Sequence, residues 1–265
     1  MSLAHFTILT HKGPTLNAYN DISALFGYPP LHKTPSECLI LIDSGYSHAT
    51  VTPLVYGRPI QPAIRRLEIG GKFLTNHLKE LVSIRHWDLH NDPHVISLIK
   101  DDTCFISSDF DRDLQRTWKG SRAPQDPGND ITLDYVLPDF ESLFRGYSRP
   151  HDPSPVAIAR SLNVGNAPRG PQAQIEHSFP IGNERFTVPE LLFNPPDVGL
   201  GQAGLPEIVV QSLSCVPQGL WPGLLGNVVL VGGSAKMPGF VERLEAEIRS
   251  LVPADIVVRV KRPEE

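Results

Sequence analysis

The chain has 265 residues, 40% of them hydrophobic and 20% charged, so it is long enough for one large globular domain or two small ones. The formal net charge of −5 excludes the strongly basic surface of direct nucleic-acid binders, and the basic residues Arg259, Lys261 and Arg262 are interpreted as a solvated tail. No apolar run approaches about 18 residues, so no membrane span or membrane partner is predicted.

Short apolar and β-branched runs predict strands in the first part of the chain, after an irregular lead-in over residues 1–35. These runs are 38–42, its antiparallel return 49–56, and then 65–69 and 104–106. Apolar residues at helical spacing predict one helix over 72–84 and another that begins at Pro93, just after the capping residue Asp92. The inward-facing residues are Leu74, Leu78, Leu81 and Val82 in the first helix, and Val95, Ile96 and Ile99 in the second.

Proline is unusually frequent, with 26 residues, about twice the usual share of roughly 5%. Much of it lies with Gly, Ser and Asn in one region, so we expect residues 111–180 to be an insertion of long surface loops. The elements predicted after it are helices over 189–193, 206–213 and 240–251 (the last with Leu244, Ile248 and Leu251 aligned) and strands over 228–231 and 256–260. Because strands and helices alternate, the fold class is α/β or α+β with a mixed sheet.

Two small-residue turns each follow a buried strand. The first is Asp43-Ser44-Gly45, where successive N–H groups can form a nest for an anion and the carboxylate of Asp43 can hold a metal ion through water. The second is Gly232-Gly233, where the lack of Cβ atoms lets a flat ring lie against the backbone. Phosphate at one turn and base at the other would make a nucleotide cleft.

Two other patterns do not predict sites. The sequence Gly199 to Gly204 matches the dinucleotide fingerprint by its letters, but prolines precede and follow it where a strand and a helix are needed, so we expect a loop. His86, His90 and His94 have the spacing of metal ligands on one helical face, but the helix break before Pro93 separates them, so we interpret them as surface residues.

The two turns and the segment between them resemble the second half of the actin fold. The similar segments, in order, are 41–45, 66–75, 100–101, 232–233 and 237–239. Further segments resemble the nuclear actin-related members of that family, namely 43–47, 71–80, 134–140 and 184–190.

The resemblance implies an actin-like (ribonuclease H-like) ATPase-fold half, in which helices flank the mixed sheet. A large subdomain would comprise 36–70 and 205–265, and a smaller helical subdomain 71–204 would carry the insertion. It also implies a site for ATP with Mg²⁺, with Asp43 as the metal ligand. The residues placed in this site are Asp43, Ser44, Gly45, Lys100, Asp101, Gly232, Gly233, Lys236 and Met237.

Two departures from the family pattern argue against catalysis. Ser47 and Thr50 stand where the family has a second glycine and a histidine that positions the attacking water, and a hydroxyl cannot replace imidazole in proton transfer near neutral pH. The segment with the family's first phosphate loop and its closing helices are also missing from the sequence. We therefore expect a partial chain in which nucleotide binding is weak or absent, because one wall of the cleft is lacking.

The resemblance implies a non-catalytic nuclear subunit of an SWR-type chromatin remodeller, which exchanges a core histone for its variant. Its expected partners are the remodeller ATPase, a zinc-finger HIT subunit and the nucleosome. The alternatives are an active ATPase or sugar kinase of the same superfamily, and a cytoplasmic relative of actin.

Overall fold

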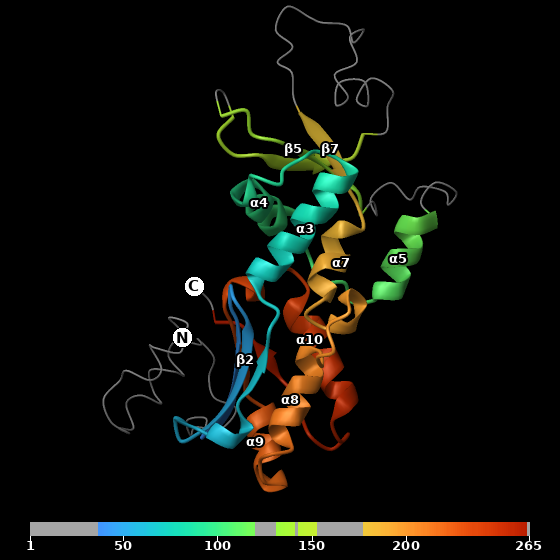
Figure 1. The fold of residues 1–265 in the computed structure, drawn as a ribbon. Coiled ribbons are helices and arrows are strands. Elements are labelled where there is room, and N and C mark those ends of the chain that lie inside the picture. The colour runs from blue at the N-terminus through green and yellow to red at the C-terminus, as the bar shows by residue number, and fades with distance from the viewer. Residues whose placement is uncertain (1–36, 120–130, 141–142, 153–176, 264–265) are drawn as a thin grey trace, which may run out of the picture. The chain divides into compact units, whose positions relative to one another are not determined.

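The computed structural model describes residues 37–119, 131–140, 143–152 and 177–263, which belong to two compact units (Figure 1). The first unit is Met1–Leu74 with Glu190–Glu265, and the second is Thr75–Pro189. The sequence predicts these boundaries after residue 70 and after residue 204. The predicted irregular lead-in, residues 1–35, lies outside the described residues. Each unit is built around its own sheet.

A mixed sheet with the strand order β3-β2-β1-β8-β9 forms the centre of the first unit, and β4 also pairs with β2. Its strands are β1 (Cys38–Ser44), β2 (Ala49–Val55), β3 (Arg58–Pro59), β4 (Arg65–Leu67), β8 (Val228–Val231) and β9 (Val260–Lys261). Strand β1 is antiparallel to β2 and parallel to β8. Every residue of β1 after Cys38 is buried, as expected for a strand covered on both faces. The sheet and its helices confirm the predicted fold class.

Helices pack on this sheet and on one another. They are α8 (Leu205–Leu213), which contacts β2 and β4, α9 (Trp221–Leu225), which contacts β1, and α10 (Phe240–Leu251), which contacts α8 and β9 (Figure 1). Short 3-10 turns precede or join these elements: η1 (Gln61–Ala63), η2 (Pro195–Val198), η3 (Gln218–Leu220) and η4 (Gly233–Lys236). Among the described residues, no helix has both the length and the apolar character needed to cross a membrane.

The end of the first unit differs from the prediction in two places. Leu244 and Ile248 of α10 are buried, but Leu251 is 45% exposed because the helix ends there and Val252 takes the buried position. Of the predicted strand 256–260, only Val260 pairs with β8.

The turn between β1 and β2 is fastened to the start of α3 (Gly71–Arg85). The N–H groups of Gly71 and Lys72 donate to the carbonyls of Gly45 and Tyr46, at 3.0 and 2.7 Å. The turn lies so close to Gly70 that a Cβ atom there would be 2.5 Å from the backbone nitrogen of His48. Only glycine therefore fits between the hairpin and the helix.

The helix predicted over 189–193 lies earlier, as α7 (Glu184–Glu190), and a turn follows it. The carbonyl of Asn183 starts α7 by accepting from the N–H groups of Phe186 and Thr187, at 3.2 and 3.0 Å. Pro189 lies in the last turn of α7 rather than in the first turn of a helix. Because proline has no N–H, one helical hydrogen bond is not made in this last turn.

The last residue of α7 is anchored within the first unit. Glu190 is 1% exposed, and its Oε1 accepts from Asn194 Nδ2 at 2.6 Å and from Arg243 Nη2 of α10 at 3.2 Å. Burial raises the pKa of Glu190, while the guanidinium of Arg243 opposes that shift. The guanidinium also lies over the Phe193 ring, 5.3 Å from its centroid. These contacts hold the turn after α7 against α10.

The second unit contains a three-stranded antiparallel sheet, which the prediction missed. The strand order is β6-β5-β7, with β5 (Leu133–Val136), β6 (Tyr147–Pro150) and β7 (Ser178–Ile181). These strands, and most of α5 (Phe110–Lys119), fall in the region 111–180 that was expected to be loops. The central strand is too short for a clear period-2 pattern, but its Tyr135 is fully buried. The proline-rich stretches 121–130 and 153–176 lie outside the described residues.

Helices α3 and α4 (Pro93–Thr103) contribute apolar side chains to this unit as predicted, except that Leu81 is only partly buried. The fully buried ones are Leu78, Val82, Ile96 and Ile99. Residues 104–106 do not form the expected strand. Instead, the N–H of Cys104 donates to the Lys100 carbonyl at the end of α4, and the N–H of Phe105 donates to the carbonyl of Arg185. The Phe186 ring lies 5.9 Å from that of Phe105 and 5.7 Å from that of Phe110.

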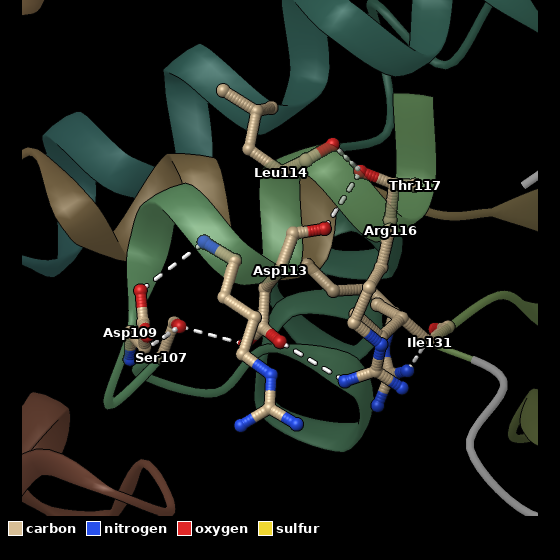
Figure 2. A network of polar contacts seen from close by, with 9 residues as sticks. Ser107, Asp109, Asp113, Leu114, Arg116, Thr117 and Ile131 are labelled. Carbon is tan, nitrogen blue, oxygen red and sulfur yellow. Dashed lines mark hydrogen bonds and ion pairs between the residues drawn. The ribbon is translucent and has the colours of Figure 1, made fainter. Parts of the chain in front are cut away.

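Polar contacts secure α5 at its start (Figure 2). Asp109 Oδ1 accepts from the N–H of Arg112 at 3.1 Å, which caps the helix. The Asp113 carboxylate accepts from Ser107 Oγ at 2.7 Å and from Arg116 Nη1 at 3.1 Å. Arg185 donates from Nε to the Thr103 carbonyl at 2.9 Å and from Nη1 to the Ile131 carbonyl, so it ties α7 to the segments on either side of α5.

Substituting Gly70 by Ala should lower the free energy of unfolding by about 1–3 kcal/mol, because the new methyl group overlaps the β1–β2 turn. Chemical denaturation of the Gly70→Ala variant measures this change. Gly201→Ala is the matched control, since no atom lies within 4 Å of a Cβ at Gly201. Equal stabilities of the two variants would show that the turn does not pack on Gly70.

Phe186→Ala should cost about 3–5 kcal/mol, because it removes a fully buried ring from the core of the second unit. Hydrogen exchange of amides in α4 and β5 reports the loss. Phe144→Ala, at a position 74% exposed in the same unit, should leave the exchange unchanged. A small effect of Phe186→Ala would contradict the ring packing described above.

Candidate nucleotide-binding site

The two glycine turns meet at one edge of the first unit's sheet. Because β1 and β8 are parallel neighbours, with Asp43 paired to Val231, the turns that follow both strands leave the sheet at the same edge. Open sheets of α/β proteins bind ligands outside the carboxyl ends of their parallel strands. The predicted phosphate and base turns are therefore neighbours within one unit.

Gly232 brings the second turn into contact with the first. Its φ is +101°, and a Cβ atom there would lie 2.3 Å from the Ser44 carbonyl oxygen and 2.9 Å from Asp43 Oδ1. No other residue fits this position without moving the β1 turn. At Gly233, which is exposed, a Cβ atom would meet nothing within 4 Å, so the backbone there is open to a flat ligand.

The Asp43 carboxylate is the clearest sign of a ligand. The residue is 7% exposed, and its Oδ1 is buried without a hydrogen-bond donor among the described residues. A buried acceptor without a partner costs free energy, whereas a hydrated Mg²⁺ or a phosphate-bound cation would satisfy it. The carboxylate chemistry and the glycine cradle beside it thus fit a magnesium nucleotide.

The tip of the β1–β2 hairpin offers backbone donors, but not the one predicted. Gly45 N–H donates to the His48 carbonyl at 3.1 Å, because the hairpin closes there, so it is not available to an anion. Among the described residues, none accepts a hydrogen bond from the N–H groups of Tyr46, Ser47 or His48. These three donors could meet a phosphate in place of Gly45.

Ser44 lies on the other side of the hairpin from Asp43, because side chains alternate along a strand. It pairs with Ala49 and is fully buried, and its Oγ also has no partner among the described residues. Its carbonyl, rather than its hydroxyl, is what approaches Gly232.

The base turn continues as η4, where Lys236 is exposed and Met237 is 7% exposed. Arg262 Nη1 donates to the carbonyl of Ala235 in this turn at 3.1 Å. The prediction treated Arg262 as part of a solvated tail. No local pattern could have revealed this contact, because it is made by the segment after β9 reaching back to η4.

Lys100 and Asp101 belong to the second unit, at the end of α4. Lys100 is 6% exposed, and its Nζ donates to Thr75 Oγ1 at 3.0 Å and lies 3.5 Å from Asp101 Oδ1. Asp101 is largely exposed. The contacts within the first unit bring together Asp43, Ser44, Gly45 and Gly232. Lys100 and Asp101 take no part in those contacts.

The glycine-rich segment 199–204 and the three spaced histidines do not belong to the site. The residues from Gly199 to Gly204 form the loop between η2 and α8, with no strand before them, which confirms the loop prediction. Helix α3 ends at Arg85 and α4 begins at Pro93, so His86, His90 and His94 do not share a helical face.

Comparison with known proteins finds a matching family and several similar proteins. The family model described as Actin matches residues 3–265. The chain is 48% identical over 262 residues to an actin-like protein arp6 of Emericella nidulans, which covers 96% of this chain and 54% of the relative. It is 46% identical over 258 residues to actin-related protein 6 of Neurospora crassa (96% and 56% covered) and 42% identical over 235 residues to actin-related protein 6 of Drosophila melanogaster (88% and 54%).

The chain thus spans about half the length of these curated relatives. The family match covers both turns and both units. The chain belongs to the actin family.

Proposed function

We propose that this chain is the nucleotide-holding part of a non-catalytic nuclear subunit in an SWR-type chromatin-remodelling complex. In this role the subunit acts in assembly and nucleosome engagement while the complex exchanges a core histone for its variant. The proposal is supported by membership of the actin family and by the similarity to relatives named actin-related protein 6. Its partners would be the remodeller ATPase, a zinc-finger HIT subunit and the nucleosome.

The observation that carries the nucleotide part is the unpartnered Oδ1 of Asp43 beside the Gly232 cradle. Asp43 would hold the magnesium ion through water, and the N–H groups of Tyr46, Ser47 and His48 would donate to phosphate oxygens. The backbone at Gly233 would lie against the base. A bound magnesium nucleotide would bring a cation and negatively charged phosphates to this edge. We propose that its effect is to hold the two turns together.

The absence of catalysis is proposed from the residue opposite Asp43. Thr50 pairs directly with Asp43 across the β1–β2 ladder, so a hydroxyl occupies the position where the family has its water-positioning histidine. A threonine hydroxyl does not accept a proton near neutral pH. Backbone donors and a carboxylate suffice to bind a phosphate, so binding can persist where hydrolysis is lost.

Gly232→Ala should weaken ATP binding by a factor of about ten or more, equivalent to about 1.4 kcal/mol, because the methyl group forces the two turns apart. Calorimetric titration of the protein as expressed from its gene measures the affinity. Gly233→Ala is the matched control, because a Cβ there meets open space. Equal losses in both variants would contradict the proposed roles of the two glycines.

Affinity purification of the tagged protein from nuclei should recover the remodeller ATPase and a zinc-finger HIT protein. Mass spectrometry of the purified material identifies them. Recovery of no remodeller subunit would contradict the assembly role. A burst of phosphate release from the purified protein on addition of ATP would favour an active ATPase instead.

A further inference from the structure

The loop between β5 and β6 of the second unit presents two phenylalanine rings to solvent. Phe140 is 59% exposed and Phe144 is 74% exposed. The N–H of Phe140 donates to the carbonyl of Leu143 at 3.2 Å, so Phe140 and the residue after Leu143 are neighbours across one turn. Single exposed apolar side chains are common, but adjacent exposed aromatic rings are typical of surfaces that bind another protein. We call residues 139–140 and 143–144 the phenylalanine turn.

The backbone of Phe140 is in a conformation that its side chain disfavours. Its φ is +58°, in the left-handed region that bulky residues rarely adopt and that glycine or asparagine adopts at lower cost. Burial of the ring in the core could offset this strain, but the ring is mostly exposed. The fold of this chain thus gives no reason for a phenylalanine at position 140, whereas a contact with a partner would give one.

Hydrogen bonds fix the shape of the phenylalanine turn. Asp139 Oδ1 accepts from the N–H of Leu143 at 2.7 Å, and the N–H of Asp139 donates to the Leu143 carbonyl at 3.1 Å. Where the loop leaves β5, the N–H of Leu137 donates to the carbonyl of His177, just before β7, at 2.8 Å. The turn is therefore held at its base and at its start.

The returning side of the loop is held as well. Arg145 Nη2 donates to Asp102 Oδ1 of α4 at 2.7 Å. Gly146 lies so close to β5 that a Cβ atom there would be 2.5 Å from the Val136 carbonyl oxygen. Because the loop is fixed on both sides, the two rings lose little conformational freedom when they bind, which favours affinity.

The charges at the loop indicate the kind of partner. The charged side chains in its described parts, 137–140 and 143–146, are Asp139 and Arg145, and Arg145 pairs with Asp102. Two carboxylates against one guanidinium give this surface a negative net charge. Such a surface repels the phosphate backbone of DNA and complements a protein surface with basic side chains.

We propose that the phenylalanine turn docks a protein subunit of the remodelling complex, with Phe140 and Phe144 inserted into an apolar pocket that has a basic rim. This inference rests on the assembly role proposed above and names the surface that performs it. Aromatic anchors that fill a pocket supply most of the affinity of many interfaces, while the surrounding contacts exclude water.

Phe140→Gly separates docking from folding. Glycine adopts a positive φ without strain, so the variant should unfold at a temperature no lower than that of the wild-type protein, although the docking ring is lost. Affinity purification of the tagged protein, expressed from its gene, should recover one remodeller subunit from nuclei in amounts reduced about tenfold or more. Phe144→Ser should reduce the recovery of the same subunit. Ile84→Ser is the matched control, at an exposed apolar position of α3 in the same unit, and should recover the wild-type amount.

A photo-reactive benzophenone amino acid in place of Phe144 identifies what the turn contacts. A cross-link to a protein subunit of the remodeller is the expected result, and a cross-link to DNA or to a second copy of this chain would overturn the proposal. Wild-type recovery by both phenylalanine variants would overturn it too, as would a lower unfolding temperature of Phe140→Gly that accompanies its loss of recovery. These results would leave the assembly role intact. If the wild-type protein recovered no remodeller subunit, the assembly role and the docking surface would both fail.

Discussion

The parallel pairing of β1 with β8 is the constraint on which the rest of the first unit depends. It places the turn after Asp43 beside the turn at Gly232, although these segments are far apart in the chain. The turns can touch only because residue 232 has no side chain, since any Cβ atom would overlap the Ser44 carbonyl. The same close approach buries the Asp43 carboxylate and leaves its Oδ1 without a protein donor. A buried acceptor of this kind carries a free-energy cost that a bound cation would offset.

Both passages of the chain into the second unit are anchored by contacts within the first unit. Helix α3 begins where its first N–H groups bond the carbonyls of Gly45 and Tyr46, so its start is fixed to the phosphate turn. Helix α7 ends at Glu190, which is held by Arg243 of α10, the helix that follows the base turn. A change at the β1–β2 turn would therefore act on the start of α3.

Binding and hydrolysis make different demands on the hairpin. Binding needs a carboxylate, backbone N–H groups and small residues, and these are present at Asp43, at the turn tip and at Gly232. Hydrolysis needs a proton acceptor near the attacking water, and Thr50 cannot provide one. The side chain of His48 stands on the same side but two ladder pairs nearer the tip. This difference is the reason that we propose nucleotide binding without hydrolysis for the hairpin.

The sequence by itself determined the elements whose pattern is local: the β1–β2 hairpin, β8, and the buried faces of α3, α4 and α10. It also determined the two turns, because glycine at a strand end has a direct steric meaning. The tertiary structure decided the rest. Strand β5 and its neighbours were hidden in a proline-rich region, since four-residue strands show too little alternation to be recognised. The use of Gly45 N–H within the hairpin and the contact of Arg262 with the base turn both depend on which segments pair across space. No local pattern records that pairing, because it is set by burial and hydrogen bonding between distant parts of the chain.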